Sequence, residues 1–239
     1  MFARFLLCIS LLVSGLAFGR EAGSQARWHW PKEGERVPAL LLVTSERGVN
    51  SFFTREIERW VEAGYGVLAI DLFEGKIPKD EKEANRFRDG LSIENTAIIL
   101  EAALAQTLRQ PRIDPERIGL LSWGVGASHS LRWLRGQKSV RAAALVSANP
   151  MLESQELAKI RAKLFLAYPK NSGNAREIAA FESALKQSKI SSEIKTYEAK
   201  TALFMDFSTP ASFEASAAEK MRADVMGFLG RHAALKEYK

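Results

Sequence analysis

The sequence predicts an α/β fold of three layers, in which a mostly parallel sheet of about seven to eight strands carries helices on both faces. Short apolar runs alternate with longer stretches in which apolar residues recur at helical spacing. No linker rich in Pro, Gly or Ser interrupts this alternation. Because strand, crossover helix and strand in repetition place the strands parallel with right-handed connections, we expect one sheet in a single domain.

The expected strands are short runs rich in apolar and β-branched residues, typical of strands that helices cover on both faces. In chain order they span residues 37–44, 66–71, 117–122, 142–147, 162–168 and 193–197, and residues 28–30 are expected to add an edge strand. The first expected helix is marked by apolar residues at helical spacing, namely Phe53, Ile57, Trp60 and Val61. Later helices are expected over residues 91–109, 125–136, 174–188 and 212–233.

The N-terminus has the pattern of an export signal. Residues 5–19 form the only long uncharged apolar run, and Arg4 precedes it. Its apolar core is shorter than the roughly 20 residues that a membrane span needs, and small residues favour cleavage near position 19 or 26. We therefore expect residues 1–26 to be a signal peptide with a short N-terminal segment, and 27–239 to be one exported domain, periplasmic or secreted. An uncleaved N-terminal membrane anchor is the alternative.

Composition excludes several classes of protein. The chain has 239 residues, with 34 Lys or Arg against 28 Asp or Glu. The hydrophobic fraction of 46% is too high for a disordered chain. One Cys and three scattered His exclude a disulfide scaffold and leave no cluster for zinc. The formal charge of +6 is spread along the chain, which favours a solvated surface over nucleic-acid binding. We therefore expect no metal, no cofactor and no nucleic-acid partner, and the oligomeric state stays open.

The most informative loop is Ser122-Trp123-Gly124-Val125-Gly126-Ala127, between an expected strand and an expected helix. In parallel sheets, ligands bind beyond the carboxyl ends of the strands, and this loop begins at such an end. A strand that turns sharply through small residues into a helix is typical of a nucleophile elbow, whose middle residue normally bears the attacking atom.

Together with three other blocks, this loop resembles the dienelactone hydrolase family of α/β-hydrolases. Residues 37–43 and 48–50 are similar to the family's first core strand and loop, and residues 63–73 to its second block. Residues 113–119 lead into the elbow as they do in that family. The resemblance covers roughly residues 37–207. It implies an α/β-hydrolase-like fold and, for the family, hydrolysis of carboxylic esters or lactones.

The resemblance also implies three catalytic positions, and each of them lacks the expected side chain. The family carries Cys or Ser at the centre of the elbow, where this chain has Gly124. The family's acid follows the strand at 162–168. This chain has Lys170 there, and no Asp or Glu lies between that strand and the next expected helix. Its histidine follows the last strand, where Ala202 or Leu203 stands. A degenerate triad is therefore expected.

Other residues are weak substitutes for these positions. Ser122 lies where elbows prefer a small residue, so the small size of Ser explains its presence without a catalytic role. His129, one turn into the following helix, is expected to be packed or at the surface, because a base must lie within hydrogen-bond reach of its nucleophile. Asp71 ends a strand without a base or nucleophile beside it, and is expected to organise a turn.

The remaining features of the loop are suited to binding a ligand. Backbone N–H groups at the start of the helix after the elbow are expected to point outward as an anion or oxyanion site. An acidic residue of the family's first loop falls on Ser45 in an ungapped match, with Glu46 adjacent. The candidate binding pocket therefore comprises Ser45, Glu46, Ser122, Trp123, Gly124 and Val125. Because Gly adopts positive φ freely, we expect Gly124 to keep the strained elbow conformation.

Three functional hypotheses follow. The first is an exported noncatalytic relative of dienelactone hydrolases that binds a small acidic or carbonyl ligand at the strand ends. The second is a hydrolase of esters or lactones with an atypical arrangement around Ser122, and the third is a protein-interaction module of the cell envelope. A second candidate ligand site is the predicted loop Asn85-Arg86-Phe87-Arg88-Asp89, whose two Arg residues can meet an acidic ligand. A solvated basic loop is its alternative.

Overall fold

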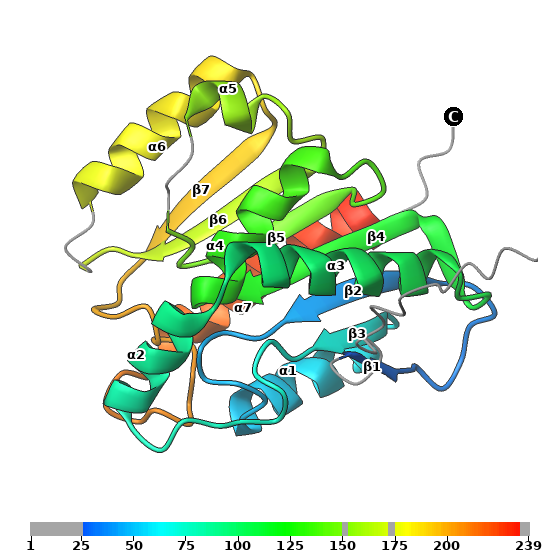
Figure 1. The fold of residues 1–239 in the computed structure, drawn as a ribbon, viewed down its shortest axis with the longest axis horizontal. Coiled ribbons are helices and arrows are strands. Elements are labelled where there is room, and N and C mark those ends of the chain that lie inside the picture. The colour runs from blue at the N-terminus through cyan, green and yellow to red at the C-terminus, as the bar shows by residue number, and fades with distance from the viewer. Residues whose placement is uncertain (1–25, 150–152, 172–174, 235–239) are drawn as a thin grey trace, which may run out of the picture.

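A computed structural model describes residues 26–149, 153–171 and 175–234. The expected signal peptide and its cleavage sites near positions 19 and 26 lie outside the described residues, apart from Ala26 itself. The described strands form one seven-stranded sheet in the order β1-β3-β2-β4-β5-β6-β7 (Figure 1). Every neighbouring pair is parallel except β1 with β3. The predicted α/β fold, with its mostly parallel sheet, is confirmed.

The strands lie close to the predicted runs. They are β1 Ala26–His29, β2 Val37–Val43, β3 Gly66–Ile70, β4 Ile113–Trp123, β5 Ala142–Val146, β6 Lys163–Pro169 and β7 Ser192–Tyr197. The helices are α1 Ser51–Glu62, α2 Glu81–Gly90, α3 Ile93–Leu108, α4 Gly124–Trp133, α5 Ser154–Leu157, α6 Ala175–Ser188 and α7 Ala215–Leu229. Two short helical segments, η2 Leu134–Gly136 and η3 Gly230–Ala234, follow α4 and α7 directly.

The predicted loop at residues 85–89 is wrong, because these residues belong to α2. Asp80 caps this helix by accepting a hydrogen bond from the Glu83 N–H, at 2.8 Å. In turn, the Glu83 carboxylate accepts from the Lys79 N–H, at 2.8 Å. This capping, together with acidic residues in the first turn, favours a helix that contains few apolar residues.

Two apolar layers enclose the sheet. Helices α3, α4 and α6 cover one face, and α1 and α7 cover the other (Figure 1). Alternate residues of β2 divide between the layers, so that Leu41 joins the α3 and α4 side and Leu40 the α1 and α7 side. Among the described residues no helix is both long and apolar enough to cross a membrane. The two layers fix the sheet, and the carboxyl ends of its central strands β2 and β4 meet at one edge.

Candidate functional site

The elbow between β4 and α4 depends on two glycines. Gly124 has a φ of +54°, which confirms the predicted positive φ. A Cβ at Gly126 would lie 2.1 Å from the Thr44 carbonyl oxygen at the end of β2. Position 124 therefore favours Gly, because a side chain is strained at positive φ, and position 126 needs Gly because two backbone segments approach too closely for a side chain.

Glu46 occupies the space in which an elbow nucleophile would lie. Its Oε2 atom accepts a hydrogen bond from the Val125 N–H, at 3.2 Å, at the start of α4. A Cβ added to Gly124 would lie 2.5 Å from the same oxygen. The carboxylate thus satisfies the N–H group that we expected to face a ligand, and it cannot keep this position beside a Cys or Ser at residue 124.

The elbow pocket lies between the loops that follow β2, β4 and β7. Its volume is about 20 Å³, enough for roughly one water molecule. It is lined by Ser45, Glu46, Phe52, Trp123, Gly124, Ala202, Leu203, Met205 and Asp206. Four of the six predicted site residues line it, and Val125 contributes the N–H group that Glu46 accepts. Ala202 and Leu203, at the expected histidine position, lie on the pocket wall and offer no imidazole.

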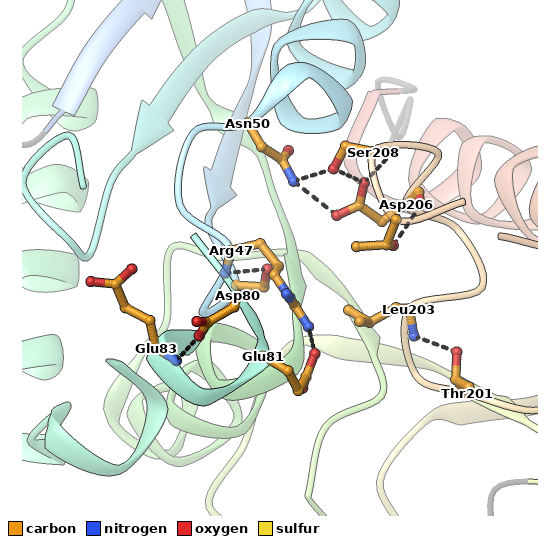
Figure 2. Close-up of polar contacts among 11 residues, drawn as sticks. Arg47, Asn50, Asp80, Glu81, Glu83, Thr201, Leu203, Asp206 and Ser208 are labelled. Atoms are coloured by element: carbon orange, nitrogen blue, oxygen red, sulfur yellow. Dashed lines mark hydrogen bonds and ion pairs between the residues drawn. The ribbon is translucent and has the colours of Figure 1, made fainter. Parts of the chain in front are cut away.

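Asp206 is a pocket residue that the sequence analysis missed. It is only 4% exposed, and its carboxylate accepts hydrogen bonds from Asn50 Nδ2 at 2.8 Å and from the Ser208 N–H and hydroxyl (Figure 2). Asn50 also caps α1 by accepting from the Phe53 N–H, at 2.9 Å. The loop after β7 is therefore fastened to the start of α1. The available signal was an acid directly after the apolar pair Phe204 and Met205.

Arg47 joins the loop after β2 to α2 beside the pocket. Its side chain is 11% exposed and pairs with the carboxylate of Glu81, whose side chain is 67% exposed (Figure 2). The Arg47 N–H donates to Ser45 Oγ at 3.1 Å, which fixes the turn that carries Glu46. These contacts fix the position of Glu46 beside the elbow.

Ser122 lies in β4 below the elbow and does not reach the pocket. Its residue is fully buried, and its Oγ has no hydrogen-bond partner among the described residues. An inaccessible hydroxyl without a base cannot serve as a nucleophile. The Trp123 ring packs edge-on against Phe52 and Phe53, with centroids 5.5 and 5.9 Å away. Trp123 therefore both lines the pocket and belongs to the core.

His129 faces away from the elbow chemistry. Its Nδ1 lies 2.9 Å from Thr96 Oγ1 on α3 and the residue is buried, as predicted for a packed histidine. Burial lowers the pKa of His129, the positive charge of Arg132 lowers it further, and Glu94 opposes the shift. The His129 ring is thus a contact between α3 and α4.

At the expected acid position after β6, the residues form contacts with the loop after β7. Lys170 follows β6 and pairs with the exposed Glu198 after β7. The Asn171 N–H donates to the Ala199 carbonyl oxygen at 3.1 Å. In the described part of the chain, no group of three or more His, Cys, Asp or Glu side chains lies close enough together to hold a metal ion.

Several solved structures share the fold of this chain. No functionally curated protein is similar enough in sequence to match. The structure resembles m3DLH, with a TM-score of 0.79 at 18% identity over 90% of this chain and 95% of that one. A dienelactone hydrolase from Anabaena variabilis has a TM-score of 0.66 at 18% identity, covering 87% of this chain and 91% of that one.

A third similar structure is a dienelactone hydrolase-like promiscuous phosphotriesterase from metagenomic libraries. Its TM-score is 0.73 at 14% identity, and the match covers 88% of this chain and 94% of that one. At these identities the structures establish the fold. The sequence profile of the Dienelactone hydrolase family matches residues 25–233, so the chain belongs to the dienelactone hydrolase family.

Proposed function

We propose that this chain is an exported, noncatalytic member of the dienelactone hydrolase family that binds a small ligand at the elbow pocket. The observation that carries the proposal is Gly124 at the nucleophile position, with the Glu46 carboxylate in the space that a nucleophile would fill. Ala202 and Leu203 on the pocket wall, and Lys170 after β6, leave the histidine and acid positions of the triad without an imidazole or a carboxylate.

The charges of the pocket favour a neutral carbonyl ligand over an acidic one. Glu46 and Asp206 both line it, and none of the described lining residues is basic. An anion would meet two carboxylates, whereas a carbonyl oxygen can accept from the Val125 N–H once Glu46 has moved aside. Because the volume of about 20 Å³ holds only a water-sized group, binding requires this movement of Glu46.

Activity measurements test the loss of catalysis. We expect negligible turnover of aryl esters and dienelactones, and no stoichiometric labelling of the mature chain by a fluorophosphonate. A hydrolase that lacks its triad retains at most roughly 10³–10⁴-fold acceleration over water. Gly124→Cys alone should remain slow, because none of the described residues that line the pocket is a histidine that could deprotonate the thiol. A burst of acyl release that Ser122→Ala abolishes would instead establish the atypical hydrolase.

Paired small probes test the binding. Gamma-butyrolactone is a neutral carbonyl compound and acetate is an anion of comparable small size. We expect the lactone to shift the amide NMR signal of Val125 and acetate to leave it unchanged. Glu46→Ala should strengthen lactone binding, because it frees the Val125 N–H. If neither probe shifts Val125 in the parent or in Glu46→Ala, or if acetate alone does, the proposed ligand class is wrong.

Export is tested by the N-terminus of the protein that the producing cell makes. We expect the intact mass of the mature chain to correspond to a start near Arg20 or Arg27. Recovery of soluble cytoplasmic protein that retains Met1 would contradict export, and recovery of uncleaved chain in the membrane fraction would favour the anchored alternative.

A further inference from the structure

A second pocket lies between the loop after β3 and helix α2. Its volume is about 300 Å³, within the lower range of small-molecule sites. It is lined by Leu72, Phe73, Glu74, Lys76, Arg86, Phe87, Gly90 and Leu91. It shares no lining residue with the elbow pocket, so whatever binds in it is independent of the proposed function.

The walls of this pocket are built by specific local contacts. Asp71 accepts hydrogen bonds from the Phe73 N–H at 2.9 Å and from the Gly75 N–H at 2.5 Å, which folds the loop after β3 into a turn. This is the structural role predicted for Asp71. The rings of Phe73 and Phe87 then stack with centroids 5.3 Å apart and planes 16° from parallel. The stack joins loop and helix, so the pocket exists without a ligand.

The rim of the pocket is cationic. Arg86 is exposed and forms no ion pair with any described residue. On the same helix, Arg88 contacts Asp89, with 3.1 Å between Nε and Oδ1. Lys76 is also exposed, and its Nζ lies 3.9 Å from Glu74 Oε2, at the limit of an ion pair. With Arg86, Lys76 and Glu74, the rim carries a net positive charge. The floor beside it is aromatic and aliphatic.

We propose that this pocket binds a small organic monoanion with a flat apolar body, of the aryl carboxylate class. The carboxylate would lie at the rim between Arg86 and Lys76, because a guanidinium and an ammonium both donate charge-assisted hydrogen bonds to it. The ring would pack on Phe87 and Leu91. Glu74 at the same rim disfavours ligands that carry several negative charges.

The test uses 2-naphthoate with the full mature chain, followed by backbone amide NMR. We expect saturable shifts at Lys76, Phe87, Gly90 and Leu91, which line the pocket, and none at Val125. Neutral 2-naphthamide should bind about tenfold more weakly, the effect of losing one charge-assisted interaction. Equal binding of acid and amide would overturn the proposal, as would shifts confined to the elbow or no saturation at millimolar naphthoate.

Matched variants on one helix separate the pocket from general surface charge. Arg86→Gln should weaken naphthoate binding about five- to tenfold. Arg88→Gln, which removes the same charge outside the pocket lining, should leave the affinity within about twofold. Equal losses in both variants would mean that only net charge matters and would overturn the proposal. Because Arg86 is exposed, its substitution is expected to leave the fold intact, and circular dichroism of both variants checks this.

Discussion

The elbow and the two loops that face it differ in what they retain of a hydrolase site. The elbow keeps the backbone geometry of a hydrolase site, with positive φ at Gly124 and an outward N–H at Val125. At the expected acid and histidine positions, the loops after β6 and β7 carry Lys170 and Ala202 or Leu203 in place of a carboxylate and an imidazole, and the Asn171 N–H joins the two loops by donating to the Ala199 carbonyl oxygen. Backbone geometry and catalytic side chains have therefore separated within one site.

The difference follows from what holds each region. The elbow lies between the central strands β2 and β4, and Gly126 packs directly against the Thr44 carbonyl. Any change of its path would disturb the core. The facing loops are held by backbone hydrogen bonds, such as Asn171 with Ala199, and by side chains, such as Asp206 with Asn50, and neither kind of contact requires a catalytic side chain. Packing thus preserves the elbow after its reaction is lost, which predicts where substitutions are costly.

Gly126→Ala should have the largest effect on stability. Its Cβ would lie 2.1 Å from a backbone oxygen, so that β2 or α4 must shift. We expect a loss of about 3 kcal/mol in the free energy of unfolding, at the upper end of overpacking. Urea denaturation of the variant measures it. A loss below about 1 kcal/mol would show that the elbow is not pinned by packing.

Gly124→Ala should cost about 1–3 kcal/mol, because a side chain is forced into positive φ. Gly136→Ala is the matched control, since the space around its added Cβ is open. That control should be neutral or slightly stabilising. Combining Gly124→Ala with Glu46→Ala separates two causes: the clash with Oε2 is relieved, while the backbone strain remains. Full recovery in the double variant would assign the cost to Glu46 alone.

Sequence reasoning located the sheet and the elbow because their physical signals are local. Buried parallel strands read as apolar runs, and β2, β3 and β5 begin and end within a residue of prediction. The positive φ of Gly124 followed from a strained turn that Gly alone adopts without cost. Both features are encoded by residues next to each other in the chain.

Features that depend on distant partners were not predictable in the same way. Glu46 and Gly124 are 78 positions apart, and only the fold brings the carboxylate to the Val125 N–H. The contact of Asp206 with Asn50 spans 156 positions, so no local motif marks Asp206 as a pocket residue. Helix α2 was missed for a different reason: its signal, the cap at Asp80, is local, but the helix contains few apolar residues.

Asp206→Ala tests the facing loop, where we expect a loss of about 1–2 kcal/mol. The substitution removes the acceptor for Asn50 Nδ2 and for the Ser208 N–H. Ser208→Ala is the milder control, because Asn50 still reaches Asp206 in it. Thermal melts of both variants rank them. If Asp206→Ala cost as much as Gly126→Ala, the facing loop would be as firmly fixed as the elbow, and the comparison would fail.

Ser122→Ala should have the smallest effect, although the residue lies two positions from the elbow centre. The Ser122 hydroxyl is fully buried and has no hydrogen-bond partner among the described residues, so its removal leaves no other group unsatisfied. Burying a hydroxyl without a partner is itself unfavourable, and its loss should change stability by less than about 1 kcal/mol, in the stabilising direction. Urea denaturation of parent and variant under identical conditions measures the change. A destabilisation above that value would reveal a partner for Ser122, and with it a polar network beneath the elbow that packing alone does not explain.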